Sequence, residues 1–176
     1  AYTLIDTTPG ATITWTSDKP IVVYGYAVVD EGQRLIVEPG TQVYFHRGSG
    51  LWVFEGGSIQ AGSSTGEAVV FQGDRLEEFF SEEPGQWDRI WILGGTVNNS
   101  FENTIIKNNF IGIQVEPSPF DPAISNSLVD NRLILKNVAI RNNSIAGIFS
   151  RNYRIQAENL LVSSSGQNCL AATGAG

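Results

Sequence analysis

Short runs in which hydrophobic and polar residues alternate fill the middle of the chain, a pattern typical of β-strands with one buried face. Gly, Pro and Ser turns separate them. Six strands within about 60 residues leave no room for crossover helices. Only residues 75–83 have a helical pattern, which stops at Pro84-Gly85 and predicts a helical excursion. The predicted strands are 35–37, 43–45, 51–53, 58–60, 69–71 and 90–92.

The second half of the chain contains a repeat. Each copy has a charged residue, Asn, two mostly apolar residues and then Ile or Val. The Asn residues are 34 and 22 residues apart, so a 22-residue unit with a 12-residue insertion in the Pro-rich stretch 116–122 fits both intervals. The three copies occupy 101–108, 135–142 and 157–164.

A β-rich unit of 22 residues cannot bury its apolar side chains alone and must stack on copies of itself. Helical repeats need about 33 to 47 residues, and the leucine-rich frame is absent. We therefore predict an all-β parallel β-helix, a solenoid with coils of about 22 residues. Residues 1–30 are expected to form N-terminal capping strands, and residues 31–176 the coils of one domain.

Asparagine recurs at the same corner of each predicted coil. Its side chain can hydrogen-bond the coils above and below, forming a ladder. The candidates for this structural ladder are Asn103, Asn137 and Asn159, and Asn108 and Asn142 form a shorter second one.

Several segments resemble a known group of proteins. Residues 35–45, with an apolar triplet, Glu-Pro-Gly-Thr and a second apolar triplet, resemble the opening coil of right-handed parallel β-helix proteins. Segments 73–77, 84–87 and 90–99 look like uncharacterised β-helix lipoproteins of the Bacteroidetes cell envelope. The resemblance covers roughly residues 28–172. It implies a right-handed β-helix and an extracellular or outer-membrane surface location, and it brings no activity and no catalytic residues.

The last residues, 171–176, depart from this pattern because they contain no capping strand or helix. An open end of stacked strands exposes apolar side chains and unpaired edges. We therefore expect either a chain that continues beyond residue 176 or an envelope protein that covers the C-terminal coil.

Charge and hydropathy exclude several functions. The chain has 11 Lys and Arg against 18 Asp and Glu, a net charge of −7 with no basic cluster, so nucleic acid is not an expected partner. Its apolar runs of about four residues are far shorter than the roughly 20 that span a bilayer, so no transmembrane segment is expected. The single Cys169 cannot form an internal disulfide, and we expect it to be a small buried hydrophobic residue.

The search for catalytic residues yields none. His46 is the only histidine, and we expect it at a surface or corner beside a turn. Asp74, Asp88, Glu102 and Arg89 are the candidates for glycan-cleaving chemistry. However, adjacent strand residues such as Asp88 and Arg89 point to opposite faces, and Asp74 fits a loop-fixing role.

No metal site or cofactor is predicted either. An oxygen-only calcium site in the acidic segment 77–83 lacks the Asp-x-Asp-x-Asp/Asn-Gly frame. A solvated face rich in Glu is the preferred interpretation. The acidic residues concerned are Glu77, Glu78, Glu82 and Glu83.

Aromatic residues before position 92 suggest a ligand surface. Alternation directs Trp52 and Trp91 away from their apolar neighbours, and with Tyr44 they are candidate ligand-binding residues for sugars. The other interpretation is that these rings pack under the loop formed by residues 72–89. We predict an exported structural or binding module that binds polysaccharide or joins an envelope assembly, and is not an enzyme. The alternative is a carbohydrate-active β-helix enzyme, a polysaccharide lyase or glycoside hydrolase, or a fragment of one.

Overall fold

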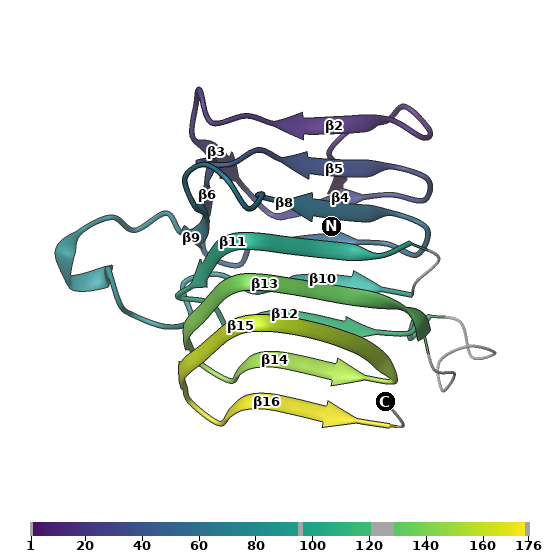
Figure 1. Cartoon of the computed structure of the whole chain (residues 1–176). Helices are drawn as coiled ribbons and strands as arrows, with labels where there is room; N and C mark the ends of the chain where they lie inside the picture. Colours follow the sequence, from purple (N-terminus) through teal and green to yellow (C-terminus); the bar gives the residue numbers. More distant parts are fainter. Residues whose placement is uncertain (1, 95–96, 121–128, 175–176) are drawn as a thin grey trace.

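A computed structural model describes residues 2–94, 97–120 and 129–174 of the chain. Its strands form two parallel sheets of seven and nine strands (Figure 1). The seven-stranded sheet contains, in spatial order, β1 (Tyr2–Leu4), β4 (Tyr26–Val29), β7 (Gly50–Val53), β10 (Ile90–Leu93), β12 (Ile111–Glu116), β14 (Ala146–Arg151) and β16 (Asn168–Thr173).

The nine-stranded sheet is built around strand β11. Its two arms meet there, and two further strands follow β11 in parallel. The arms are β2 (Thr12–Trp15), β5 (Arg34–Val37) and β8 (Ser58–Ala61) on one side, and β3 (Ile21–Val23), β6 (Gln42–Phe45) and β9 (Val69–Gly73) on the other. They are joined by β11 (Asn99–Lys107), which is followed by β13 (Val129–Asn143) and β15 (Tyr153–Ser165).

Asparagines in a left-handed conformation bend the long strands. The first part of β11 pairs with β8 and its last part with β9, and between them Asn103 has a φ of 48°. Asn137 in β13 and Asn159 in β15 each have a φ of 52°. Asparagine adopts this conformation more readily than most side chains do, because it can hydrogen-bond locally. The nine-stranded sheet therefore turns back on itself and is nearly closed.

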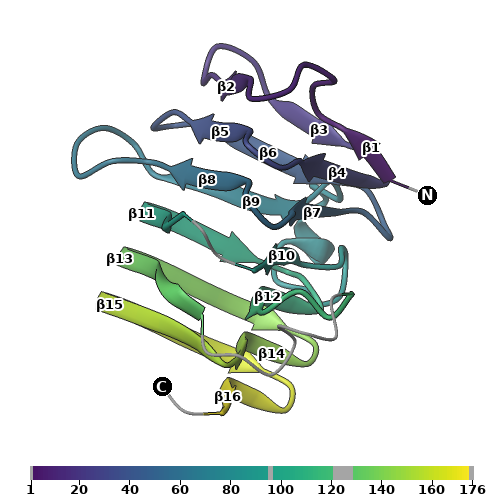
Figure 2. The same ribbon diagram turned by 90° about the vertical axis from the view of Figure 1, so that its right-hand side faces the viewer.

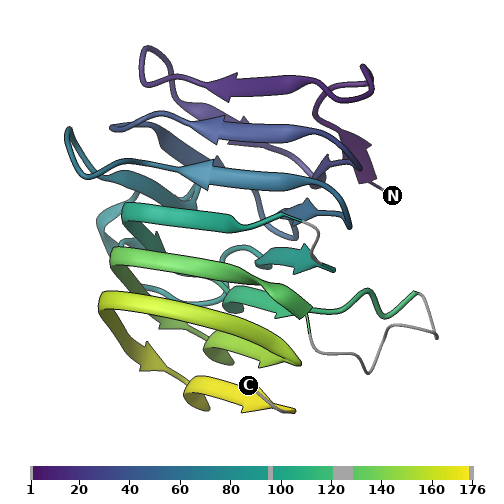
Figure 3. The same cartoon turned by 45° about the vertical axis from the view of Figure 1, so that its right-hand side comes forward.

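The core lies between the two sheets, which face each other in Figures 2 and 3. Alternate strand residues point into it: Leu51 and Val53 are fully buried, whereas Trp52 between them is only half-buried. Burial of these apolar side chains is the main stabilising contribution of the fold. Other fully buried members are Leu35, Val43, Phe45, Phe71, Ile90, Phe101, Ile106 and Leu133.

The all-β prediction and the six short strands are confirmed, as is the alignment of the repeats, since Phe101 pairs with Leu135 and Leu135 with Ala157. The right-handed β-helix solenoid with coils of about 22 residues is wrong. The chain forms two stacked parallel sheets. The number of residues between two paired positions also differs from one strand pair to the next. Thr12 pairs with Arg34, but Gln60 pairs with Ser100.

The structure also differs from the predicted N-terminal capping strands and helical excursion. Strands β1 to β4 are members of the two sheets, and segment 75–83 contains only one 3-10 turn, Glu78–Phe80. The sequence was misleading because the regular repeat covers only β11, β13 and β15, which are neighbours in one sheet. A local repeat of this kind does not determine how the first hundred residues are arranged.

Candidate functional site

The outer face of the seven-stranded sheet carries three aromatic rings in contact. Trp52 and Trp91 pair in register, and both are half-buried between fully buried neighbours, so they point outward. The ring of Tyr26 on β4 lies 4.4 Å from that of Trp52, with 32° between the planes. The rings of Trp91 and Trp52 pack edge to face, with centroids 5.2 Å apart and 87° between the planes. We call Tyr26, Trp52 and Trp91 the aromatic row.

Polar side chains border the aromatic row on the next two strands. Glu116 at the end of β12 is buried and accepts a hydrogen bond from Trp91 Nε1 at 2.9 Å. It also accepts from Gln114 Nε2 at 2.6 Å and from Arg151 Nε at 3.0 Å. Gln114 in turn accepts a hydrogen bond from Arg89. These charge-assisted bonds fix the Trp91 indole and the amide beside it.

Asp88 and Arg89 lie at the other border of the aromatic row. Arg89 Nε donates to Asp88 Oδ1 at 2.9 Å, so the expectation that these side chains point to opposite faces is wrong. The physical reason is that both residues precede β10 and are free of strict strand alternation. Burial raises the pKa of the Tyr26 hydroxyl, and the negative charge of Asp88 raises it further.

Two other predicted candidates lie away from the aromatic row. Tyr44 is in β6 of the nine-stranded sheet, where it pairs in register with Val22 and Gln72. Glu102 is in β11 of the same sheet and pairs with Lys136. Of the predicted ligand-binding residues, the structure therefore brings together Trp52 and Trp91, with Tyr26 as the third ring.

The predicted asparagine ladder is continuous between two of its three members. Asn159 Nδ2 donates to Asn137 Oδ1 at 2.7 Å, whereas Asn103 Nδ2 donates to the carbonyl of Gly66 at 3.1 Å. In the second set, Asn142 Nδ2 donates to Asn108 Oδ1 at 3.3 Å. All five lie at left-handed bends, so their positions are explained by backbone geometry.

A cavity of about 460 Å³ lies where the chain leaves β9 and returns to β10. Residues 74–86, which we call the excursion, project from the body of the fold at this point (Figure 1). The cavity is lined by His46, Arg47, Asp74, Arg75, Phe79, Phe80, Glu83, Pro84, Gly85 and Gln86. The size and mixed lining are those of a site for a small ligand.

A histidine–aspartate pair forms one wall of this cavity. His46 Nδ1 lies 2.7 Å from Asp74 Oδ2, and the Tyr24 ring lies 4.9 Å from the imidazole. A carboxylate on Nδ1 orients the imidazole and leaves Nε2 for another partner. No local sequence pattern links the two residues. The missed signal is strand register: Phe45 pairs with Gly73, so the next residues of both strands meet.

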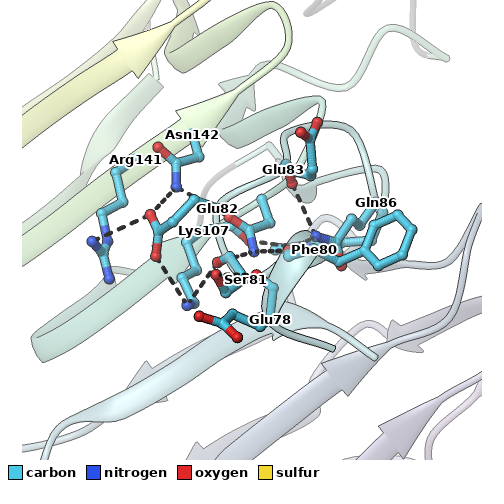
Figure 4. A network of polar contacts seen from close by, with 11 residues as sticks. Glu78, Phe80, Ser81, Glu82, Glu83, Gln86, Lys107, Arg141 and Asn142 are labelled. Carbon is cyan, nitrogen blue, oxygen red and sulfur yellow. Dashed lines mark hydrogen bonds and ion pairs between the residues drawn. The ribbon is translucent and has the colours of Figure 1, made fainter. Parts of the chain in front are cut away.

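A polar network anchors the excursion to the body of the fold (Figure 4). The Glu82 carboxylate lies 3.8 Å from Lys107 Nζ and 3.5 Å from Arg141 Nη1. Asn108 Nδ2 donates to the Ser81 carbonyl at 2.9 Å. These contacts from β11 and β13 hold the outer wall of the cavity in place before any ligand binds.

The acidic residues of the excursion do not gather around a common point. Glu82 is held by the cations of the body, and Arg75 pairs with Glu77 at 3.2 Å. The hydrogen bond from Arg75 lowers the pKa of Glu77. Among the described residues, no group of three or more His, Cys, Asp or Glu is placed to hold a metal ion.

Cys169 is exposed, so the expectation of a buried hydrophobic residue is wrong. It lies in β16, which among the described strands pairs only with β14. Its neighbour Leu170 is also 56% exposed, because no further strand covers this edge within the described residues.

No protein-family model matches this chain, and neither does a curated protein or a solved structure. Within the described residues, no helix is long and apolar enough to cross a membrane. Function is therefore inferred from the two sites themselves.

Proposed function

We propose that this protein is a carbohydrate-binding module that holds a glycan across the aromatic row. The observation that carries this proposal is the contact between Tyr26, Trp52 and Trp91 on the outer face of one sheet. Aromatic faces supply apolar contact area, and a few fixed polar groups give orientation and specificity. Sugars, which have apolar ring faces and a rim of hydroxyls, match both features.

Trp91 is the ring best suited to stack on a sugar. One face of Trp52 is taken up by Tyr26, whereas the contacts of Trp91 with Trp52 and Phe120 are edge-on or tilted. Its indole is fixed by the hydrogen bond to Glu116, so little side-chain entropy is lost on binding. Arg89 and Gln114 lie beside it and offer donors and acceptors to hydroxyl groups.

The carboxylates beside the aromatic row support binding more than cleavage. Glycoside hydrolysis uses two carboxyl groups separated by roughly 5 to 9.5 Å. Asp88 lies two residues before β10, whereas Glu116 pairs with Leu93 at the other end of that strand. At about 3.3 Å per residue, their Cα atoms are on the order of 16 Å apart along the strand. A glycoside hydrolase acting at this surface is therefore the less favoured alternative.

An exported, cell-surface location is part of this proposal, because polysaccharides are encountered there. Cell fractionation of the source organism with an antibody to the protein tests it. Participation in an envelope assembly, with another protein on the C-terminal edge, stays a separate prediction from the sequence.

The binding proposal is tested with a panel of soluble plant, algal and bacterial polysaccharides, using affinity electrophoresis and then titration calorimetry. We expect at least one polysaccharide to retard the protein and to change its tryptophan fluorescence. Trp91→Ala should weaken that binding about tenfold or more, and Trp52→Ala less. For comparison, stacking of a nucleobase on an aromatic side chain is worth about 1–3 kcal/mol.

Tyr44→Ala is the matched control, because it removes a half-buried ring from the other sheet. It should leave affinity unchanged. Thermal unfolding of each variant separates loss of binding from loss of the fold. Binding that survives Trp91→Ala, or a panel in which no polysaccharide binds, would refute the proposal.

A further inference from the structure

The cavity beside the excursion contains one arginine that is not held in an ion pair. Arg47 and Arg75 line the cavity together with two carboxylates, Asp74 and Glu83. Arg75 already has partners, because its guanidinium lies 3.9 Å from the centre of the Phe80 ring and forms an ion pair with Glu77. Arg47 is exposed and forms no ion pair with any described residue.

The other cavity residues provide what a sugar residue requires. His46 has Nδ1 held by Asp74, which leaves Nε2 as a second polar contact. Glu83 provides a carboxylate that accepts hydrogen bonds from hydroxyls. Phe79 is 76% exposed at the cavity, where its ring provides an apolar face.

The cavity and the aromatic row adjoin each other at one corner of the fold. Tyr24 contacts His46 of the cavity, and Tyr26, two residues later, stacks on Trp52 of the aromatic row. Gly25 between them has a φ of 75°, and its N–H donates to Ser49 Oγ at 2.8 Å, which fixes the corner. A chain-like ligand on the aromatic row therefore reaches the cavity by passing this corner.

We propose that the cavity is a subsite for a uronic acid residue, so that the bound glycan is an acidic one. This inference rests on the proposed carbohydrate binding and specifies its ligand class. Arg47 binds the carboxylate, and His46 Nε2 contacts a hydroxyl or carboxylate oxygen. Glu83 accepts hydrogen bonds from hydroxyls only, and Phe79 covers the ring. The guanidinium fork matches a carboxylate geometrically, and such charge-assisted bonds are stronger than neutral ones.

The test is an NMR titration of the ¹⁵N-labelled full chain with methyl glycosides of glucuronic, galacturonic and mannuronic acid. Each is compared with its neutral parent sugar, which carries a hydroxymethyl group in place of the carboxylate. We expect at least one uronide to shift the amide signals of His46, Arg47 and Gly85, with an affinity about fivefold above that of its parent. Arg47→Gln should abolish this preference.

Arg34→Gln is the matched control, because it removes the same charge from β5, remote from the cavity, and should keep the preference. Equal affinity for acid and parent, or no shifts at the cavity residues, would overturn the uronate subsite. Either result is independent of the aromatic row: a neutral polysaccharide whose binding depends on Trp91 would still support the proposed function. If a uronide shifts the NMR signals of the cavity residues but Trp91→Ala binds every polysaccharide as the native protein does, only the proposed function of the aromatic row is refuted.

Discussion

The indole of Trp87 stacks on the ring of Phe45, with centroids 4.2 Å apart and 9° between the planes. Both side chains are fully buried, and Trp87 Nε1 donates to the Lys107 carbonyl at 2.8 Å. Trp87 directly follows the excursion, so this pair ties the returning chain to the core just beneath the cavity. Trp52 and Trp91, in contrast, face outward.

Replacing Trp87 should destabilise the whole fold. Trp87→Phe keeps part of the stack but leaves a small cavity and an unpaired Lys107 carbonyl, so we expect a loss of about 2–3 kcal/mol in the free energy of unfolding. Chemical denaturation measures it. Phe79→Ala, on the exposed part of the same excursion, should cost less than about 0.5 kcal/mol. Similar losses in both variants would contradict this assignment.

The left-handed bend at Asn137 predicts different outcomes for two small replacements. Asn137→Gly retains the backbone conformation and loses the hydrogen bond from Asn159, whereas Asn137→Ala also introduces strain at a φ of 52°. We expect the alanine variant to be about 1 kcal/mol less stable than the glycine variant in thermal unfolding. Equal stability of the two variants would mean that the bend is not maintained in solution.

Tyr153 predicts a dependence of stability on alkaline pH. Burial raises the pKa of its hydroxyl above the usual value near 10, and nearby Asn99 opposes this shift without forming a hydrogen bond of normal geometry. Because the folded state holds this proton more tightly, its contribution is complete below about pH 10 and is lost as the pH rises through the folded pKa.

The stability of Tyr153→Phe should therefore fall less than that of the native protein as the pH rises above about 10. At neutral pH its stability should be equal or up to about 1 kcal/mol higher, since a buried hydroxyl without a partner is removed. Unfolding in urea at several pH values tests both statements. A parallel pH dependence of the two proteins would contradict the burial argument.

Glu82 should control the excursion more than the fold. Glu82→Gln weakens the pairs with Lys107 and Arg141, but its side chain is 56% exposed, so global stability should fall by less than about 1 kcal/mol. Chymotryptic cleavage at Phe79 and Phe80 should become faster, because local opening is easier. Glu78→Gln, on the same excursion but outside these ion pairs, should cleave at the native rate. No change in Glu82→Gln would show that the network does not order the cavity wall.

The sequence by itself determined the local structure. Alternation of apolar and polar residues determines the short strands, because one face of each must be buried, and the spacing of Asn137 and Asn159 determines how β13 and β15 pair. The same alternation directs Trp52 and Trp91 outward. These features depend on residues close in sequence or on a repeat, so the pattern alone reveals them.

Only the tertiary structure decided which strands share a sheet and which side chains meet. Tyr44 is equivalent to Trp52 in local pattern, yet it lies in the other sheet, because sheet membership depends on how the chain turns at its corners. His46 and Asp74 meet because β6 and β9 pair in register, although a long stretch of chain separates them. The cavity likewise depends on Glu82 reaching cations on β11 and β13. Such long-range contacts are set by packing of the whole chain, and no local pattern encodes them.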